Sequence, residues 1–188
     1  MRFNFFGIAR HGHSYNSKLS SKGMQQADKL ADIFSLNYMI DADSLLVLSS
    51  PAMRAYQTSR IISKRIDENL INGKKHKKMV RLEIASGLWD DFDSPDRMSG
   101  KGDIARIYDR LSSILDNCTD RNDVIIVTHN SLTHMIPQYL SRMFTSQNLP
   151  FEDLNFGEAY TINFGDIGPF WKHIPSGRVL YQTKRVFY

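Results

Sequence analysis

Cysteine is nearly absent from this chain of 188 residues. Cys118 is the single cysteine, which excludes an internal disulfide framework and any zinc site built from several cysteines. A single cysteine also fits a reducing compartment, so we expect a cytoplasmic protein. Cys118 ends a helical pattern, and we expect it to be a bystander and not a nucleophile.

Long apolar runs are absent as well. No segment approaches the ~20 apolar residues that a membrane helix needs, and Asn4 interrupts the short apolar run near the N-terminus, which is too short for a signal peptide. The chain also lacks internal repeats, low-complexity tracts and a linker between domains. With 41% apolar and 23% charged residues, it has the composition of one globular domain over residues 1–188. We expect no membrane partner.

The excess of positive charge is confined to one stretch. Twenty-four Lys and Arg against twenty Asp and Glu leave a net charge of +4, and without the four lysines around His76 the charges balance. These lysines are Lys74, Lys75, Lys77 and Lys78. The basic character is therefore local, and general binding of nucleic acid is not implied. We expect a solvated loop here, with steering of an acidic substrate as the alternative.

Short apolar runs alternate with amphipathic helical patterns along the chain. We expect strands at 3–9, 45–48, 79–84, 124–127, 159–164 and 179–187, and helices after Ser20, after Ser50 with Pro51 in the first turn, within 104–115 and from about residue 131. Pro137 should delay or kink the last helix, and residues 165–177 are expected to form a loop. This alternation favours an α/β fold, a three-layer sandwich with a mostly parallel central sheet and helices on both faces.

Charged residues and histidines gather at the ends of these strands, where such sheets bind their ligands. Arg10 and His11 follow the first strand, Arg54 lies in the first turn of the helix after the second, Glu83 is in the third, and His129 follows the fourth. Arginine presents donors that match phosphate oxygens, and a helix N-terminus also favours an anion. A neutral histidine can attack phosphorus, and a glutamic acid can protonate a leaving oxygen. Together these residues predict a site for a phosphoryl group.

Each of these residues taken alone has a simpler interpretation. A histidine at a strand end is more often buried and hydrogen bonded, Arg54 could be a solvated helix residue, and Glu83 could be a half-exposed strand residue. Their common placement is what favours a site. His11 and His13 could also be a pair of metal ligands, but no acidic cluster or HExxH arrangement completes such a site. We therefore expect neither a metal nor a cofactor.

Several short motifs follow one another in the first two thirds of the chain. They are ARHGHSYN at 9–16, LSSKGMQQA at 19–27, SSPAMRAYQT at 49–58, RLEIASGLW at 81–89 and VIIVTH at 124–129. In this order they resemble the histidine phosphatase superfamily, the phosphoglycerate mutase-like proteins. The resemblance runs from about Ile8 to His129.

The resemblance implies a role for each matching residue. His11 would be the nucleophile and would form a phosphohistidine. Glu83 would protonate the leaving oxygen and then activate water. The groups that hold the phosphoryl oxygens would be Arg10, Asn16, Arg54 and His129. No metal is required for this chemistry.

The sequence also departs from the pattern of the superfamily. His13 stands where many members carry Glu, and Asn130 replaces the usual Gly after the second histidine. The backbone N–H of Asn130 could still bind phosphate, because Asn tolerates unusual backbone angles. Asp90 and Asp91 replace a frequent Glu-Gly and are the next candidates for the acid if Glu83 is not the proton donor.

The region after the first motif bears on the choice between phosphatase and mutase. Asn16 is followed almost directly by Leu19, whereas phosphoglycerate mutases carry a longer insert there. We therefore expect a metal-independent hydrolase of phosphomonoesters. The alternatives are phosphoglycerate mutase-type phosphoryl transfer and a non-catalytic module that binds a phosphorylated ligand. The substrate, whether a small molecule or a phosphoprotein, and the oligomeric state are not indicated by the sequence.

Overall fold

A computed structural model describes residues 5–37, 44–72, 79–85, 88, 108–109, 111–113, 122–145, 149–165, 168–174 and 179–182. Its strands are β1 (Phe5–Arg10), β2 (Ser14–Tyr15), β3 (Lys18–Leu19), β4 (Ser44–Ser49), β5 (Met79–Ile84), β6 (Asn122–Thr128), β7 (Ala159–Gly165), β8 (Gly168–Ile174) and β9 (Val179–Gln182). Its long helices are α1 (Ser21–Asn37), α2 (Met53–Asn72) and α4 (Asn130–Thr145). None of the helices within these ranges combines the length and the apolar character needed to span a membrane.

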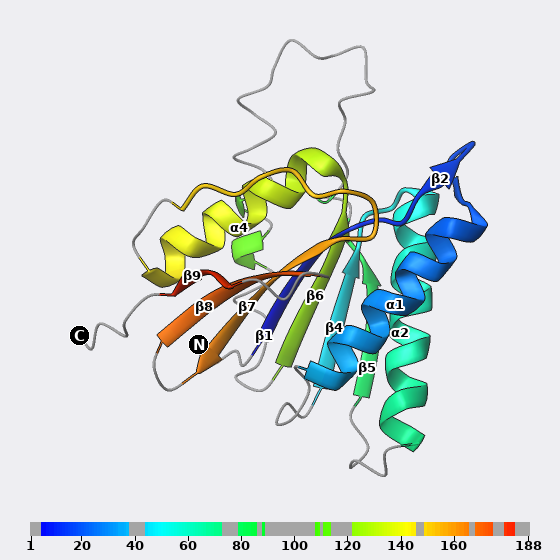
Figure 1. Cartoon of the computed structure of the whole chain (residues 1–188), viewed down its shortest axis with the longest axis horizontal. Coiled ribbons are helices and arrows are strands. Elements are labelled where there is room, and N and C mark those ends of the chain that lie inside the picture. The colour runs from blue at the N-terminus through cyan, green and yellow to red at the C-terminus, as the bar shows by residue number, and fades with distance from the viewer. Residues whose placement is uncertain are drawn as a thin grey trace.

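One seven-stranded sheet organises the molecule, in the order β5-β4-β6-β1-β7-β8-β9 (Figure 1). Strands β5, β4, β6 and β1 pair in parallel, whereas β7, β8 and β9 pair antiparallel. Because parallel strands end at the same edge of a sheet, the segments after β1, β4 and β6 meet there. Strands β2 and β3 form a separate hairpin at this edge.

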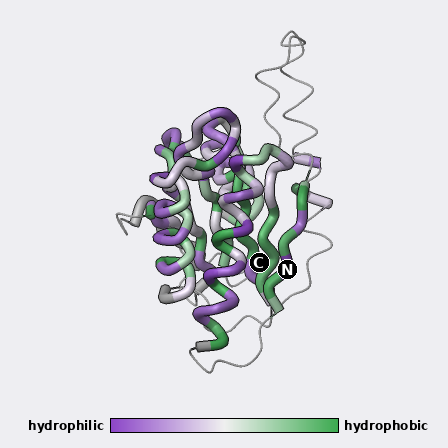
Figure 2. The backbone as a smooth tube through the Cα atoms, turned by 90° about the vertical axis from the view of Figure 1, so that its right-hand side faces the viewer, coloured by the Kyte–Doolittle hydropathy of each residue, from purple (hydrophilic) through white to green (hydrophobic). Residues whose placement is uncertain are grey.

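Helices cover both faces of the sheet, so the predicted three-layer α/β fold is confirmed. Alternate residues of β1 point to opposite sides: Phe5 packs with α1 and α2, and Phe6 packs with α4. Each face thus has its own buried core, and β1, β4 and β6 are apolar on both sides. Figure 2 shows these strands as green, hydrophobic segments in the interior.

The three long helices begin within a few residues of their predicted starts. Ser20 caps α1, where its Oγ accepts the N–H of Gly23 at 3.2 Å. Helix α2 begins at Met53, two residues after Pro51. Helix α4 begins at Asn130 and continues through Pro137, which therefore does not delay its start.

The prediction of a loop over residues 165–177 is wrong, because β8 lies within it. This strand pairs along its whole length with β7, and its Trp171 is fully buried. Gly168 and Pro169 at the start of the strand are residues typical of loops, and they hide a strand whose formation depends on pairing with β7.

Several predictions lie wholly or partly outside the described residues. These include the lysines at 74–78, Trp89 with the two aspartates after it, and Cys118. Of the helix expected within 104–115, residues 108–109 and 111–113 are described, and they are helical with Leu111 buried.

Candidate active site

The segment after β1 is held in place by backbone contacts. Arg10 ends the strand, and the N–H of His11 still donates to the carbonyl of Thr128 at 3.1 Å. The N–H of Gly12 donates to Thr58 Oγ1 at 3.1 Å, which ties the segment to α2. A Cβ on Gly12 would collide with the backbone of Gly23 in α1. A glycine is therefore required for the chain to turn against α1 at this point.

The contacts of the His11 ring define its protonation. Nδ1 lies 2.8 Å from the carbonyl oxygen of Gly12, and Nε2 accepts a hydrogen bond from Arg54 Nε at 3.0 Å. A carbonyl can only accept and a guanidinium can only donate, so the ring is neutral, with its proton on Nδ1 and a lone pair on Nε2. Burial, together with the charges of Arg54 and Arg10, lowers the pKa of His11 to about 4.

The second histidine, His129, lies between the end of β6 and the start of α4. Its Nε2 is 2.9 Å from Ser50 Oγ, and its Nδ1 is 3.4 Å from Arg54 Nη2. Because Arg54 can only donate, Nδ1 is the acceptor and the Nε2–H donates to Ser50. Burial lowers the pKa of His129 to about 3, and positive charge on His11, when that ring is protonated, and on Arg54 and Arg10 acts in the same direction. Arg54 thus bridges two neutral imidazoles whose ring centres are 5.2 Å apart.

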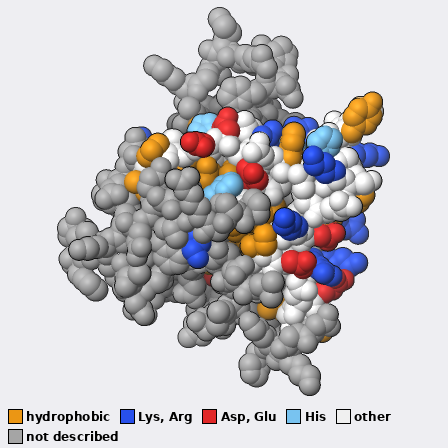
Figure 3. All heavy atoms as spheres, viewed as in Figure 1, with side chains coloured by type: hydrophobic (Ala, Val, Ile, Leu, Met, Phe, Trp, Pro, Cys, Tyr) orange, Lys and Arg blue, Asp and Glu red, His pale blue; other side chains and the backbone are white. Residues whose placement is uncertain are grey.

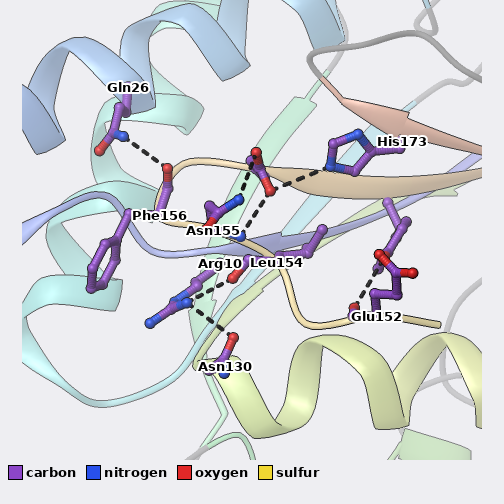
Figure 4. A network of polar contacts seen from close by, with 10 residues as sticks. Arg10, Gln26, Asn130, Glu152, Leu154, Asn155, Phe156 and His173 are labelled. Atoms are coloured by element: carbon purple, nitrogen blue, oxygen red, sulfur yellow. Dashed lines mark hydrogen bonds and ion pairs between the residues drawn. The ribbon is translucent and has the colours of Figure 1, made fainter.

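Arg10 is held between the start of α4 and the segment before β7 (Figure 4). Its Nη1 donates to Asn130 Oδ1 at 3.0 Å and to the carbonyl of Leu154 at 2.6 Å. Its Cζ lies 4.1 Å from the centre of the Phe156 ring, a cation–π contact. Burial lowers the pKa of Arg10, an effect that the nearby carboxylates of Asp153 and Glu158 oppose.

The structure brings five of the predicted site residues together. These are Arg10, His11, Arg54, His129 and Asn130. Asn130 contacts the cluster through its side chain, whereas the sequence suggested its backbone N–H. It is the first residue of α4 and does not have a positive φ. Within the described ranges, positive φ outside glycine occurs at Asn16 and Ser17.

Two predicted residues lie apart from this cluster. Asn16 occupies the exposed turn between β2 and β3, with a φ of 47°. Glu83 lies on β5, and its carboxylate pairs with Arg81 Nη2 at 3.0 Å. Strand β5 is three positions from β1 in the sheet, which is about 14 Å across the strands. Strand β5 also pairs with β4, whose end leads to Ser50 and Arg54, so Glu83 flanks the cluster on that side. Among the described residues, its ion pair is with Arg81, and no hydrogen bond or ion pair joins it to the cluster.

Sequence reasoning missed three residues that contact the cluster. Ser50 was expected to cap α2, and its Oγ does lie 3.4 Å from the N–H of Ala52, but it also binds His129. Leu154 and Phe156 belong to a segment without any motif, and Leu154 acts through its backbone carbonyl, which no sequence pattern reveals. Among the residues described, no group of three His, Cys, Asp or Glu is placed to hold a metal ion.

Comparison with known proteins decides which family builds this arrangement. The model of the histidine phosphatase superfamily, branch 1, matches residues 7–155. The chain belongs to this superfamily. The resemblance seen in the sequence motifs is thereby confirmed, and the match extends beyond His129 into the segment that carries Leu154. A search of the curated proteins finds no significant match.

Solved structures of the superfamily share the fold of this chain. The mycobacterial glucosyl-3-phosphoglycerate phosphatase in complex with VO3 has 17% identity and a TM-score of 0.56, over 90% of this chain and 96% of its own. SixA from Agrobacterium tumefaciens, provisionally assigned as a phosphohistidine phosphatase, has 16% identity and a TM-score of 0.51, over 95% and 98% of the two chains. The product of an open reading frame of Mycobacterium tuberculosis has 17% identity and a TM-score of 0.53, over 90% and 96%.

Proposed function

We propose that this chain is a phosphatase that hydrolyses phosphomonoesters through a covalent phosphohistidine on His11. The observation that carries the proposal is the protonation of the His11 ring. Its Nδ1–H is engaged by the Gly12 carbonyl, its Nε2 holds a lone pair, and two guanidinium groups lie beside it. A phosphoryl group bound by Arg10 and Arg54 would lie against that lone pair.

In the first step, Nε2 of His11 attacks phosphorus while the bond from phosphorus to the leaving oxygen breaks. The Nε–H of Arg54, which donates to Nε2 in the free protein, turns to a phosphoryl oxygen. The His11 ring becomes positively charged, and its Nδ1–H bond to the Gly12 carbonyl, 2.8 Å long, stabilises that charge. The leaving oxygen takes the electron pair of the broken bond and a proton from the carboxylic acid of Glu83, which must first leave Arg81.

In the second step, water attacks phosphorus and the bond to Nε2 breaks. The carboxylate of Glu83 takes the proton of the water, so inorganic phosphate is released and the acid is restored. The electron pair of the broken bond returns to Nε2, and His11 becomes neutral again.

His129 would hold a phosphoryl oxygen through a change of tautomer. In the structure its Nδ1 is an acceptor, which would repel such an oxygen. Its other nitrogen faces Ser50 Oγ, and a hydroxyl can donate as well as accept. When Ser50 donates to Nε2, the ring proton resides on Nδ1 and is directed at the phosphoryl group. Ser50 is thus a positioning residue for His129.

The hairpin after the first motif supports hydrolysis over mutase-type transfer. Residues 14–19 form two strands of two residues each, with a turn that contains Asn16 and Ser17. No insert stands there to build a pocket for a second substrate. The mycobacterial glucosyl-3-phosphoglycerate phosphatase, which was solved in complex with VO3 and with inorganic phosphate, supports the same proposal.

A rapid-quench experiment with a radiolabelled phosphomonoester tests the proposal. We expect a labelled protein whose phosphoryl bond survives base and breaks in acid. His11→Ala should lose both the label and turnover, whereas His13→Gln, the control two residues away, should retain both. A label that base removes would indicate an acyl phosphate and overturn the role of His11. Transfer of the label to an added acceptor in place of release as phosphate would indicate a mutase.

A further inference from the structure

The guanidinium of Arg10 is held by the protein through one of its two terminal nitrogens. Nη1 uses both of its N–H groups, on Asn130 and on Leu154. The Nε of Arg10 is buried without a hydrogen-bond partner among the described residues, so a ligand cannot reach it. Nη2 is therefore the nitrogen that Arg10 can offer to a phosphoryl oxygen, and its direction is fixed by the two contacts of Nη1.

Asn130 can hold Arg10 because its own amide is fixed from behind. Its Oδ1 must face Arg10, since a guanidinium only donates. Its Nδ2 donates to Asp153 Oδ2 at 2.9 Å, and the other carboxylate oxygen of Asp153 accepts from His134 Nδ1 at 2.7 Å. Asn130 and His134 are one helical turn apart on α4, so both face Asp153.

Asp153 directly precedes Leu154, in the segment that supplies the Leu154 carbonyl and the Phe156 ring to Arg10. Figure 4 shows Leu154 and Phe156 beside Arg10. Its carboxylate favours the positive charge of Arg10, in agreement with its place behind Asn130. Histidine and carboxylate side chains lie close together on the face that carries α4, whereas lysines and arginines are mostly on the side of α1 and α2 (Figure 3).

We propose that Asn130 and Asp153 are positioning residues that aim Arg10 at the phosphoryl group. This inference rests on the proposed function, in which Arg10 binds that group. The proposal gives a role to Asn130, which replaces the glycine usual after the second histidine. A glycine has no side chain that could link Arg10 to Asp153. His134 is the outer anchor of the chain of hydrogen bonds.

Two measurements test the proposal on the whole chain: the Kd of inorganic phosphate by calorimetry, and kcat/KM for 4-nitrophenyl phosphate. We expect Asn130→Ala to weaken phosphate binding and to lower kcat/KM by about tenfold, because it removes a hydrogen bond to a charged group. Asp153→Ala should have a smaller effect, about threefold. Glu152→Ala, the matched control, removes the same charge one residue earlier and should change neither value more than about twofold.

Coupling between the sites separates positioning from a merely structural role. The double variant of Asn130 and Asp153 should be no worse than Asn130→Ala alone, because both act through one contact. In a background of Arg10→Ala, the change Asn130→Ala should have no further effect on phosphate binding. Asn130→Ser keeps a residue favoured at helix starts but is too short to reach both partners. It should therefore show the loss in affinity with an unchanged free energy of unfolding.

The possible failures are distinguishable. If Asn130→Ala and Asp153→Ala bind phosphate and turn over ester as Glu152→Ala does, positioning by Asn130 is refuted while the phosphatase stands. If the effect of Asn130→Ala persists in the Arg10→Ala background, the proposal is also refuted. If the phosphate affinities of the unmodified protein and its variants follow the expected order but the unmodified protein hydrolyses no ester, the proposed function fails and the positioning role remains.

Discussion

The two buried histidines should make the stability of this protein depend on pH in a defined window. His11 and His129 are 4% and 6% exposed, and their pKa values are lowered to about 4 and about 3. In the unfolded chain both return to about 6.5. Between pH 4 and 6.5 the unfolded state therefore binds more protons than the folded state. The free energy of unfolding must fall as the pH falls through this window.

The size of the effect follows from the two pKa values of each ring. Between pH 7.5 and 5.5, each histidine should remove more than about 1 kcal/mol from the free energy of unfolding, and the pair about twice as much as one ring. Neither ring is charged in the folded protein at pH 5.5, so the two contributions should add. The loss is a large fraction of the ~5–15 kcal/mol by which typical domains are stable.

Urea unfolding at pH 7.5 and 5.5 measures this quantity. Over this interval, His11→Gln and His129→Gln should each lose less stability than the unmodified protein, by more than about 1 kcal/mol, and the double variant should differ by about twice as much. Gln26→Ala is the control, because it removes hydrogen bonds to His13 and Phe156 but no titratable group. The reasoning is refuted if His11→Gln shows the same dependence on pH as the control.

Three further substitutions test single contacts of the site. Arg54→Lys removes the fork that joins His11 to His129 and should lower kcat/KM for 4-nitrophenyl phosphate about 100-fold; a value near that of the unmodified protein would exclude the bridge. Glu83→Gln should slow phosphorylation by alkyl phosphates ~10²–10⁴-fold and by nitrophenyl phosphate far less, whereas equal small losses would move the acid to Asp90 or Asp91. Asn16→Ala should cost about 1 kcal/mol of stability, since φ is 47°, and leave kcat/KM within about twofold; a tenfold loss would instead support contact with phosphate.

The central strands were predicted well because burial on both faces of the sheet requires a continuous apolar run in the sequence. Strand β5 was predicted with its observed ends, and β1, β4 and β6 within one or two residues where both are described. The apolar runs of β1, β4 and β6 exist because each of these strands packs on both faces of the sheet, whereas β5 contributes only Val80 and Leu82, on one face. Strand β8 has no such run, since it begins with Gly168 and Pro169. Its formation depends on pairing with β7. Pairing between distant segments is not encoded in local periodicity.

The site was predictable to the extent that topology alone places residues. Arg10, His11 and His129 directly follow or end parallel strands, so the rule that such ends meet brings them together. Leu154 contacts Arg10 from 144 positions away, through a carbonyl that every residue possesses. The amide of Asn130 is oriented by its hydrogen bond to Asp153. The position of Asp153 depends in turn on the path of the segment before β7. Such contacts need the folded chain.

The two arginines of the site act both on the nucleophile, His11, and on the phosphoryl group. Burial must therefore keep the pKa of His11 low when substrate is bound. In the free protein Arg54 and Arg10 help to keep His11 unprotonated. A phosphate dianion bound between them would cancel that influence and favour protonation of the nucleophile. Burial is the largest cause of the lowered pKa of His11 and does not depend on the arginines, so it can keep Nε2 unprotonated when substrate is present. His129 faces a hydroxyl that can reverse its hydrogen bond, so it can present a proton to the phosphoryl group without a net charge. The same pocket can thus keep one imidazole a nucleophile and make the other a donor.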